Sequence, residues 1–276
     1  METIRRMNSV LRLCFALGLA IVCAVVPAAA NAQTPAPKIG IVIMHGKGGS
    51  PTKYVGELAQ ALEGKGYLVA NLEMPWSGKR DYDAGVAAAD QEVETALAAM
   101  RGKGAQKVFV AGHSQGGLFA LHFGDAHVVD GIIAIAPGGN VASPLVRNKL
   151  GDSVAQARQL IAAGKGEEKT RLQDFEFSKG TYPIVTTPKL YLDWFDPSGA
   201  MNEVKAAKTM NPATPVLYVA PTQDYPGLCR IKQLMFGSLP ANPLTKLYEP
   251  DASHVEAPTA SIDEIVAWTS AVAGAK

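Results

Sequence analysis

Short, almost wholly apolar runs alternate along this chain with segments of helical periodicity. The first run, Ile39-Gly-Ile-Val-Ile-Met44, shows no polar alternation, which is typical of a parallel strand covered on both faces. Five further runs of this kind follow, at residues 67–72, 108–111, 131–136, 215–220 and 245–248. Strands that alternate with helices form a parallel sheet with helices on both faces, joined by right-handed crossovers. The sequence therefore predicts an α/β fold with a mostly parallel central sheet.

Helix start signals lie between the apolar runs. Ser50-Pro51 predicts the beginning of the first helix, with serine as the N-cap and proline at the first helical position. A second helix is predicted to start near Asp83, and a third to cover residues 115–124. Ser261-x-x-Glu264 has the pattern of a capping box and marks the start of the last helix.

One connection is much longer than a crossover helix requires. Residues 137–214 separate the fourth and fifth predicted strands, with a polar, helical part at about 146–169 and an aromatic, proline-bearing part at 175–197. Long connections inside compact domains are usually functional lids or disordered insertions, and the aromatic content argues against disorder. We expect residues of about 140–210 to form a cap over the active site. The alternative is a structural subdomain away from that site.

The first 32 residues have the organisation of a secretory signal peptide. Three arginines precede or enter an apolar run from Leu13 to Val26, and Ala30-Asn-Ala32 provides an A-x-A cleavage site. The sequence predicts a signal peptide at residues 1–32 and a single large α/β domain at residues 33–276, periplasmic or secreted. A membrane anchor is the alternative, but the apolar run is short for a span of about 20 residues. We therefore expect no stable membrane insertion after cleavage.

Removal of residues 1–32 would leave a nearly neutral chain. Three arginines and one glutamate are lost, so 23 basic and 24 acidic residues remain. This balance gives no electrostatic reason to expect a nucleic-acid partner or an anionic membrane surface. Cleavage also removes Cys14 and Cys23, so Cys229 would have no partner for an internal disulfide. We expect Cys229 to be an inert, partly buried thiol.

The segment Gly112-His113-Ser114-Gln115-Gly116 follows the apolar run at 108–111 and opens the predicted third helix. A serine on such a strand-to-helix turn adopts a strained conformation, and side chains two positions before and after it would collide. Glycines at both positions remove the collision, so the hydroxyl projects from the carboxyl end of the sheet. The dipole of the following helix favours negative charge there. We predict Ser114 as a nucleophile; a plain tight turn is the alternative.

A serine hydroxyl requires a base that accepts its proton. His254 follows the last predicted strand, which places it at the same edge of the sheet as Ser114. The other histidines fit this role less well. His113 is expected to point away along the turn, and His122 and His127 lie at or beyond the end of the third helix with no metal-ligand spacing.

The acid that orients the base is expected on the loop after the fifth strand. Asp224 lies on that loop and gives the chain order serine, acid, histidine. Asp251 is an alternative because it precedes His254 by three residues. Asp193 and Asp196, on the long connection, are alternatives in a design that takes the acid from an earlier loop.

An acyl-transfer site also requires two donors for the oxyanion. The backbone amide of Gln115, the residue after the predicted nucleophile, is one candidate. The second is expected from the glycine-rich loop His45-Gly-Lys-Gly-Gly49, with the amide of Lys47 first and that of Gly48 second. The side chain of Lys47 is expected to be solvated. Phosphate binding is the competing function of this loop, but neither the Walker pattern nor the dinucleotide fingerprint is present.

Together, His45-Gly46, the Gly112–Gly116 turn, Asp224 and His254 resemble the α/β-hydrolase superfamily over almost the whole mature chain. The form Gly-His-Ser-Gln-Gly is similar to that of bacterial esterases and lipases. The loop HGKGG departs from the HGGG loop of one esterase branch. The resemblance implies acyl transfer through an acyl-serine followed by hydrolysis, on a small-molecule ester and with no metal or organic cofactor.

The sequence therefore predicts a secreted serine hydrolase of carboxylic esters. Because His254 must be neutral to accept a proton, activity is expected to fall below a pH of about 6.5. An amidase or peptidase of the same fold and a non-catalytic binding protein that retains the fold are the alternatives. Tyr182, Tyr191, Trp194 and Phe195 suggest an apolar pocket that favours esters, or else belong to the core.

Overall fold

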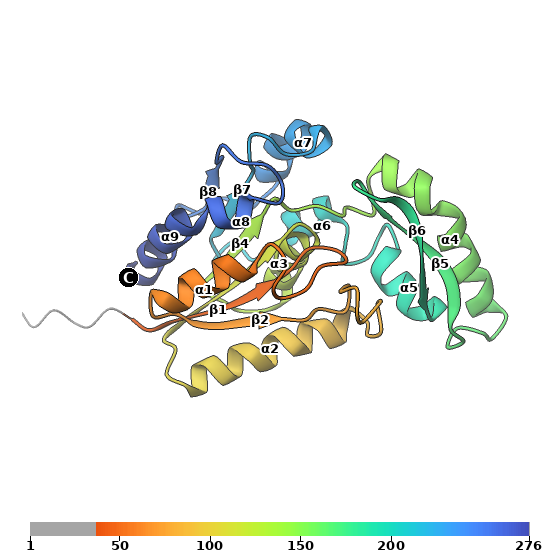
Figure 1. Ribbon diagram of the computed structural model, residues 1–276, viewed down its shortest axis with the longest axis horizontal. Helices are drawn as coiled ribbons and strands as arrows, with labels where there is room; N and C mark the ends of the chain where they lie inside the picture. The colour runs from red at the N-terminus through yellow and green to blue at the C-terminus, as the bar shows by residue number, and fades with distance from the viewer. Residues whose placement is uncertain (1–36, 276) are drawn as a thin grey trace, which may run out of the picture. The chain divides into compact units, whose positions relative to one another are not determined.

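The computed structural model describes residues 37–275, and the predicted signal peptide at residues 1–32 lies outside them. Within the described residues, six strands form one parallel sheet in the order β2-β1-β3-β4-β7-β8 (Figure 1). The strands are β1 (Ile39–Met44), β2 (Leu68–Leu72), β3 (Lys107–His113), β4 (Gly131–Ile135), β7 (Val216–Val219) and β8 (Lys246–Tyr248). The predicted parallel sheet is confirmed, strand by strand.

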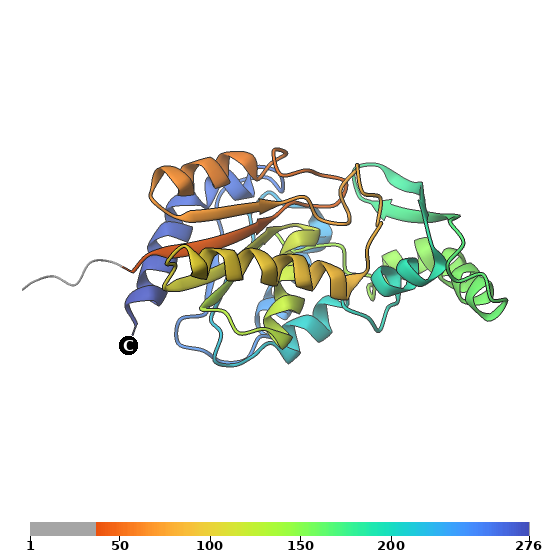
Figure 2. The same ribbon diagram turned by 90° about the horizontal axis from the view of Figure 1, so that it is seen from below.

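Helices cover both faces of this sheet. One face carries α1 (Gly56–Gly64), α8 (Ala257–Ala260) and α9 (Ile262–Gly274); the other carries α2 (Val86–Gly102), α3 (Gln115–Ala126) and α6 (Glu203–Thr209). Figure 2 shows α1 on one side of the strands and α6 on the other. Along β1, Ile41 and Ile43 pack with the first set while Val42 and Met44 pack with the second. Burial on both sides explains why this strand is apolar at consecutive positions.

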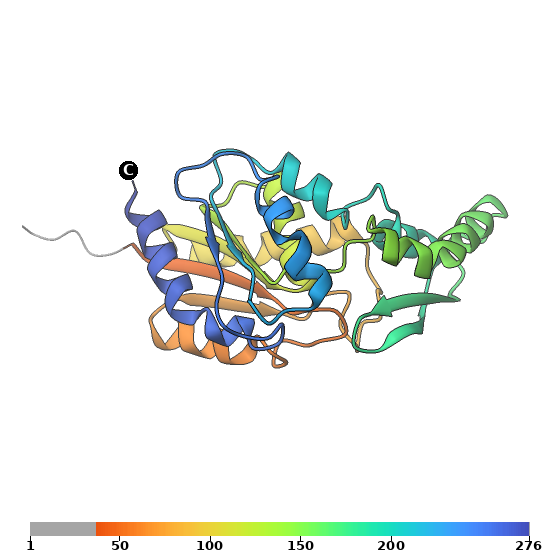
Figure 3. The same ribbon diagram turned by 90° about the horizontal axis from the view of Figure 1, so that it is seen from above.

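The long connection between β4 and β7 contains a small α+β unit, which we call the insertion. Its elements are α4 (Pro144–Ala162), β5 (Thr170–Glu176), β6 (Gly180–Thr186) and α5 (Pro188–Phe195). β5 and β6 pair as an antiparallel hairpin. In Figures 1 and 3 the insertion lies beyond the carboxyl end of β1. Its hairpin turn lines the same cavity as Ser114 and His254.

The hairpin of the insertion was not predicted from the sequence. The two buried side chains that β5 turns inward are Leu172 and Asp174, so a buried carboxylate stands where a strand pattern would have an apolar residue. This interrupts the alternation by which a half-buried strand is identified. The helical part of the connection was predicted at about 146–169; α4 begins at Pro144, and the Ser143 side chain caps it by accepting from the Val146 amide.

The first helix begins later than predicted. Ser50-Pro51 was expected to start it, but α1 begins at Gly56. The carbonyl of Pro51 accepts a hydrogen bond from the Asn71 side chain at 2.5 Å, and Tyr54 has a left-handed φ of 65°. A left-handed residue cannot continue a right-handed helix, so the segment between Ser50 and Val55 remains a turn.

The second helix also begins later, and its cap comes from a distant segment. Asp83 was expected near its start, yet α2 begins at Val86 and Asp83 forms an ion pair with Arg80. The Val86 amide donates instead to the carboxylate of Asp193 on α5, at 2.6 Å. A carboxylate at a helix N-terminus satisfies a free amide and interacts favourably with the helix dipole.

The capping box predicted at Ser261 is absent from the described structure. α9 begins at Ile262 as expected, but the Ser261 hydroxyl donates to the Ala257 carbonyl at 2.7 Å, and Glu264 pairs with Lys246. The short helix α8 runs directly into α9, so Ser261 follows a helical turn. Its hydroxyl therefore bonds back to the preceding turn, as serine inside helices commonly does.

Candidate active site

Ser114 lies on a sharp turn between β3 and α3, with φ 55° and ψ −118°. The strained conformation expected for this serine is therefore present. A Cβ at Gly112 would collide with the backbone of Gly116, and a Cβ at Gly116 would collide with the backbone of Met44 and His45 at the end of β1. The Ser114 amide donates to the Ile135 carbonyl of the neighbouring strand at 2.9 Å, which anchors the turn to the sheet.

His254 and Asp224 form a hydrogen-bonded pair. The Nδ1 atom of His254 lies 2.8 Å from an oxygen of Asp224, and the two side chains are 11% and 4% exposed. Beyond the ends of β7 and β8, a further parallel bridge joins Gln223 to Ser253. The next residues in this register are Asp224 and His254. The sheet geometry thus brings together two residues that lie 30 positions apart in the chain.

The other aspartates considered for this role have different partners. Asp251 accepts from Thr222 and Gln223, Asp193 caps α2, and Asp196 pairs with Arg158 at 2.9 Å. In the described structure none of these three carboxylates bonds to the His254 ring. Asp224 is therefore the acid that the fold brings to His254.

Ser114 and His254 line one cavity of about 740 Å³ at the carboxyl edge of the sheet. In this structure no hydrogen bond between described residues joins the Ser114 hydroxyl to the His254 ring. Hydrogen bonds of this kind are often formed only when substrate binds. The geometry therefore provides a serine at a strained turn and a carboxylate-oriented histidine in the same cavity.

His113 contacts His254 rather than pointing away, which corrects the expectation from the sequence. Its Nε2 atom donates to the His254 carbonyl at 2.9 Å, and the two rings are 4.9 Å apart between centroids. Burial lowers the pKa of His113 to about 3, so its ring is neutral and carries its proton on Nε2. A neutral donor holds the backbone of His254 without placing a second positive charge beside that ring.

The two amides predicted for the oxyanion belong to residues that line the same cavity, Lys47 and Gln115. Neither amide donates to another group within residues 37–275. His45 lies at the start of the loop that carries Lys47, and its Nε2 accepts a hydrogen bond from the Met74 amide at 3.1 Å. The Nδ1–H of His45 therefore donates to the Gly46 carbonyl at 2.7 Å. Burial lowers the pKa of His45, which keeps this neutral form.

The side chain of Lys47 is buried, contrary to the expectation that it is solvated. It is 10% exposed and forms an ion pair with Asp174 of β5 at 2.5 Å. It also donates to the Phe175 carbonyl at 3.1 Å. The sequence held no signal for this pair, because the partners are 127 residues apart and Asp174 lies on the hairpin that was not predicted.

Part of the wall of the site cavity comes from the insertion. Phe175, Glu176, Phe177, Ser178 and Lys179, at the turn of the hairpin, all line the cavity. The aromatic residues considered from the sequence do not: Tyr182, Tyr191, Trp194 and Phe195 lie elsewhere, and the last three are buried in the core. The core interpretation of these three was therefore the right one, and the aromatic side chains of the cavity are Tyr54, Phe175, Phe177 and Tyr225.

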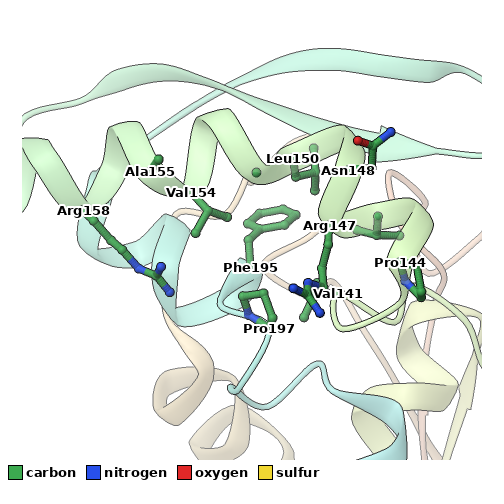
Figure 4. Close-up of a pocket in the computed structure, with 12 residues that line it drawn as sticks. Val141, Pro144, Arg147, Asn148, Leu150, Val154, Ala155, Arg158, Phe195 and Pro197 are labelled. Carbon is green, nitrogen blue, oxygen red and sulfur yellow. The ribbon is translucent and has the colours of Figure 1, made fainter.

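A second cavity lies under α4 and does not include Ser114. It has a volume of about 570 Å³ and is bordered by α4, Phe195 and Pro197 (Figure 4). Val154 and Leu150 provide apolar surface, and Arg158 lies at one end. Because it contains none of the predicted site residues, it is not the candidate active site.

Within residues 37–275 there is no group of three or more His, Cys, Asp or Glu side chains that could hold a metal ion. The same residues include no helix long and apolar enough to cross a membrane. Cys229 is partly buried on α7 (Pro226–Phe236), and its thiol lies 3.4 Å from the Asp224 carbonyl.

Glu203 is a buried carboxyl group at the cavity wall that the sequence did not single out. Its side chain is fully buried, and one oxygen accepts a 3.3 Å hydrogen bond from Tyr218. The other oxygen has no partner among the described residues. Burial raises the pKa of Glu203 to about 8, because desolvation disfavours the charged form. Glu203 is therefore neutral in the folded protein at neutral pH.

Replacement of Glu203 by glutamine should remove a pH dependence of stability. Between pH 4.5 and about pH 8 the folded chain keeps a proton that the unfolded chain releases. The free energy of unfolding of the wild type therefore falls as the pH rises through this window. We expect Glu203→Gln to match the wild type near pH 4 and to exceed it by about 3–5 kcal/mol near pH 9. Urea unfolding at both pH values measures this, and an equal difference at both would contradict the assignment.

Comparison with known proteins identifies the family to which this chain is similar. The model of a family described as serine aminopeptidase, S33, matches residues 35–176, which is more than half of the chain. The match includes Lys47, Ser114 and Gln115 and ends before Asp224 and His254. A search of curated proteins gave no match.

Similar solved structures share the fold at low sequence identity. A monoacylglycerol lipase of Paleococcus ferrophilus is 21% identical, with a TM-score of 0.60 over 84% of this chain and 94% of that one. A thermostable carboxyl esterase from Bacillus coagulans is 15% identical, with a TM-score of 0.60 over 86% and 91%. Est1E from Butyrivibrio proteoclasticus, solved with ferulic acid, is 16% identical, with a TM-score of 0.55 over 86% and 91%. From the family match and this shared fold, we conclude that the chain belongs to the serine aminopeptidase S33 family of α/β hydrolases.

Proposed function

We propose that this protein is a serine hydrolase that cleaves carboxylic esters through an acyl-serine intermediate. The observation that carries the proposal is the pairing of Asp224 with His254, which lines the same cavity as the strained Ser114. A base oriented by a carboxylate and a serine exposed on a strand-to-helix turn are the parts that acyl transfer requires.

In the proposed mechanism the Ser114 hydroxyl attacks the ester carbonyl while His254 accepts its proton. Asp224 keeps the His254 proton on Nδ1, which leaves Nε2 free to act as the base, and stabilises the ring when it becomes charged. The amides of Lys47 and Gln115 hold the oxyanion. His254 then gives its proton to the leaving alkoxide, which departs as the alcohol. In the second half, water attacks the acyl-serine while His254 accepts its proton, and His254 returns that proton to Ser114 as the carboxylic acid is released.

Esters are favoured over amides by the cavity and by the structural neighbours. Several side chains at the cavity are large, apolar and exposed, namely Tyr54, Leu145, Phe177 and Val255. Such a wall suits an apolar acyl or alcohol group. The neighbours described above include a lipase and an esterase. The insertion, whose hairpin turn lines the cavity, acts in this proposal as the cap, and the chain acts in the periplasm or outside the cell after loss of residues 1–32.

An aminopeptidase or amidase of the same fold is the second candidate. The family model is named for a serine aminopeptidase, and the carboxylate of Glu176 lines the cavity, where it could meet a substrate amine. Glu176 is however already paired with Lys179 at 2.7 Å, which leaves less charge for an incoming ammonium group. For this reason we rank the ester substrate first.

The proposal is tested by labelling and turnover in one preparation. A fluorophosphonate probe should label wild-type protein at Ser114, as mapped by mass spectrometry, and Ser114→Ala should remain unlabelled. The labelled preparation should hydrolyse p-nitrophenyl esters faster than aminoacyl p-nitroanilides. A preference for the anilides would rank the aminopeptidase or amidase above the ester hydrolase. A folded wild type with neither label nor turnover would indicate a binding protein that retains the fold.

A further inference from the structure

Asp174 is fully buried and accepts four hydrogen bonds from three separate segments. Lys47 and the Phe175 amide donate to one oxygen, at 2.5 and 2.6 Å. The hydroxyls of Tyr82 and Tyr182 both donate to the other, at 2.9 Å. Tyr182 belongs to the same hairpin, whereas Lys47 and Tyr82 belong to loops of the main domain. Because both oxygens of this buried carboxylate accept hydrogen bonds, Asp174 joins the insertion rigidly to the main domain.

One of the two residues with a proposed oxyanion amide is bonded to this carboxylate by its side chain. Lys47 reaches it directly through its ammonium group. The Tyr82 hydroxyl, from a second loop of the main domain, donates to the same carboxylate at 2.9 Å. Tyr82 is almost fully buried, at 2% exposure, so water cannot easily replace its bond to Asp174.

The backbone at Asp81 and Tyr82 is strained, and contacts with the insertion stabilise it. Asp81 and Tyr82 both have left-handed φ values, 50° and 59°. Two consecutive non-glycine residues in this region cost free energy and persist only where the surroundings fix them. The insertion supplies that support, because Thr186 donates to the Tyr82 carbonyl at 2.8 Å and the Val185 amide donates to Asp81 at 3.0 Å.

From this network we propose that Asp174 is a positioning residue of the oxyanion hole. It fixes the Lys47 amide through the Lys47–Asp174 ion pair, so that the hairpin of the insertion sets the position of this donor relative to the Gln115 amide. Asp174 itself does not touch the reacting atoms. The inference rests on the proposed function, since it assigns a role to residues around the same oxyanion.

The proposed role predicts a particular kinetic signature. Donors that are slightly misplaced stabilise the oxyanion less, while the ground-state ester, which carries no such charge, binds as before. We expect Lys47→Met, which keeps the backbone amide and removes only the ammonium group, to lower kcat about 10- to 100-fold with KM changed less than about twofold. Asp174→Asn should have the same signature. The double variant should be about as slow as the slower single variant, because both act on one network.

The experiment compares kcat and KM for a p-nitrophenyl ester with the inhibition constant of a trifluoromethyl ketone. This ketone forms a charged tetrahedral adduct with a serine and so reports on the oxyanion hole. Its affinity should fall in proportion to kcat across the variants. Tyr191→Phe is the matched control, because its hydroxyl donates to Gln173 at 2.7 Å inside the same insertion but does not reach Asp174 or the cavity. We expect it to leave kcat unchanged.

Two results would overturn the inference. One is an unchanged kcat in folded Lys47→Met; the other is a loss of kcat without weaker inhibitor binding, which would indicate a general loss of structure. Removal of one partner from a buried ion pair destabilises proteins strongly. If Asp174→Asn does not fold, Lys47→Met and Tyr82→Phe carry the same test. Fluorophosphonate labelling of the wild type separates the two proposals: an unlabelled wild type refutes the function, whereas a labelled wild type with an unaffected Lys47→Met refutes only the role of Asp174.

Discussion

Replacement of Asp224 by asparagine should lower kcat by about 10⁴-fold while the fold is retained. The carboxylate accepts from Nδ1 of His254 at 2.8 Å, and this bond requires the proton of the ring to be on Nδ1. An asparagine amide can donate to Nδ1 instead, which stabilises the tautomer with its proton on Nε2. That tautomer cannot accept the proton of Ser114, so the base is lost even though the side chains keep nearly the same shape.

Asp251→Asn is the matched control for this prediction. Asp251 lies three residues from His254, but it bonds to Thr222 and Gln223 and is exposed. Its replacement should leave kcat within about twofold of the wild type, as surface substitutions usually do. Ester hydrolysis and thermal unfolding of both variants provide the measurement. Equal losses in the two variants would mean that the acid has been assigned to the wrong residue.

Replacement of Gly112 by alanine should unfold the turn that carries Ser114. A Cβ at this position would lie 2.1 Å from the carbonyl oxygen of Gly116 and 2.2 Å from its carbonyl carbon. Both contacts are with backbone, so no side chain can rotate to relieve them, and either β3 or the start of α3 must move. We expect a loss of more than about 3 kcal/mol in the free energy of unfolding, together with loss of activity.

Gly151→Ala provides the opposite outcome with the same chemical change. Gly151 lies inside α4, is exposed, and has nothing within 4 Å of an added Cβ. Alanine costs less conformational entropy in a helix than glycine, so this variant should be more stable by about 0.5–1 kcal/mol. Urea unfolding of Gly112→Ala and Gly151→Ala shows whether a loss of stability comes from the steric collision or from the change of glycine to alanine itself. A Gly112→Ala variant as stable as the wild type would show that the turn can relax.

Parts of the fold that depend on local sequence could be predicted closely. The apolar run of β1 indicated a strand buried on both faces, and the glycines at 112 and 116 indicated a turn that only small residues allow. Local signals failed where a distant side chain replaced them. The cap of α2 is provided by Asp193, 107 residues away in the chain, and the start of α1 is delayed where Asn71 bonds to Pro51.

The candidate site, like the fold, could be predicted from the sequence only in part. The sequence indicated that Ser114, His254 and a carboxylate after β7 would meet at one edge of the sheet, because parallel strands all end there. The chain order favoured Asp224, but Asp251 remained an alternative because it precedes His254 by three residues. The register of the bridge between Gln223 and Ser253 decides it, and register depends on the pairing of two strands rather than on either one alone.

By itself, then, the sequence determined the parallel sheet, the strained turn at Ser114 and the chain order of the candidate site residues, because periodicity and steric exclusion act between neighbours in the chain. Only the tertiary structure decided which carboxylate meets His254, that His113 holds the His254 backbone, and that Lys47 is buried against Asp174. These contacts join segments from 30 to 141 residues apart. A polar side chain in such a contact has no local pattern, since its burial is favourable only when the whole fold brings its partner to it.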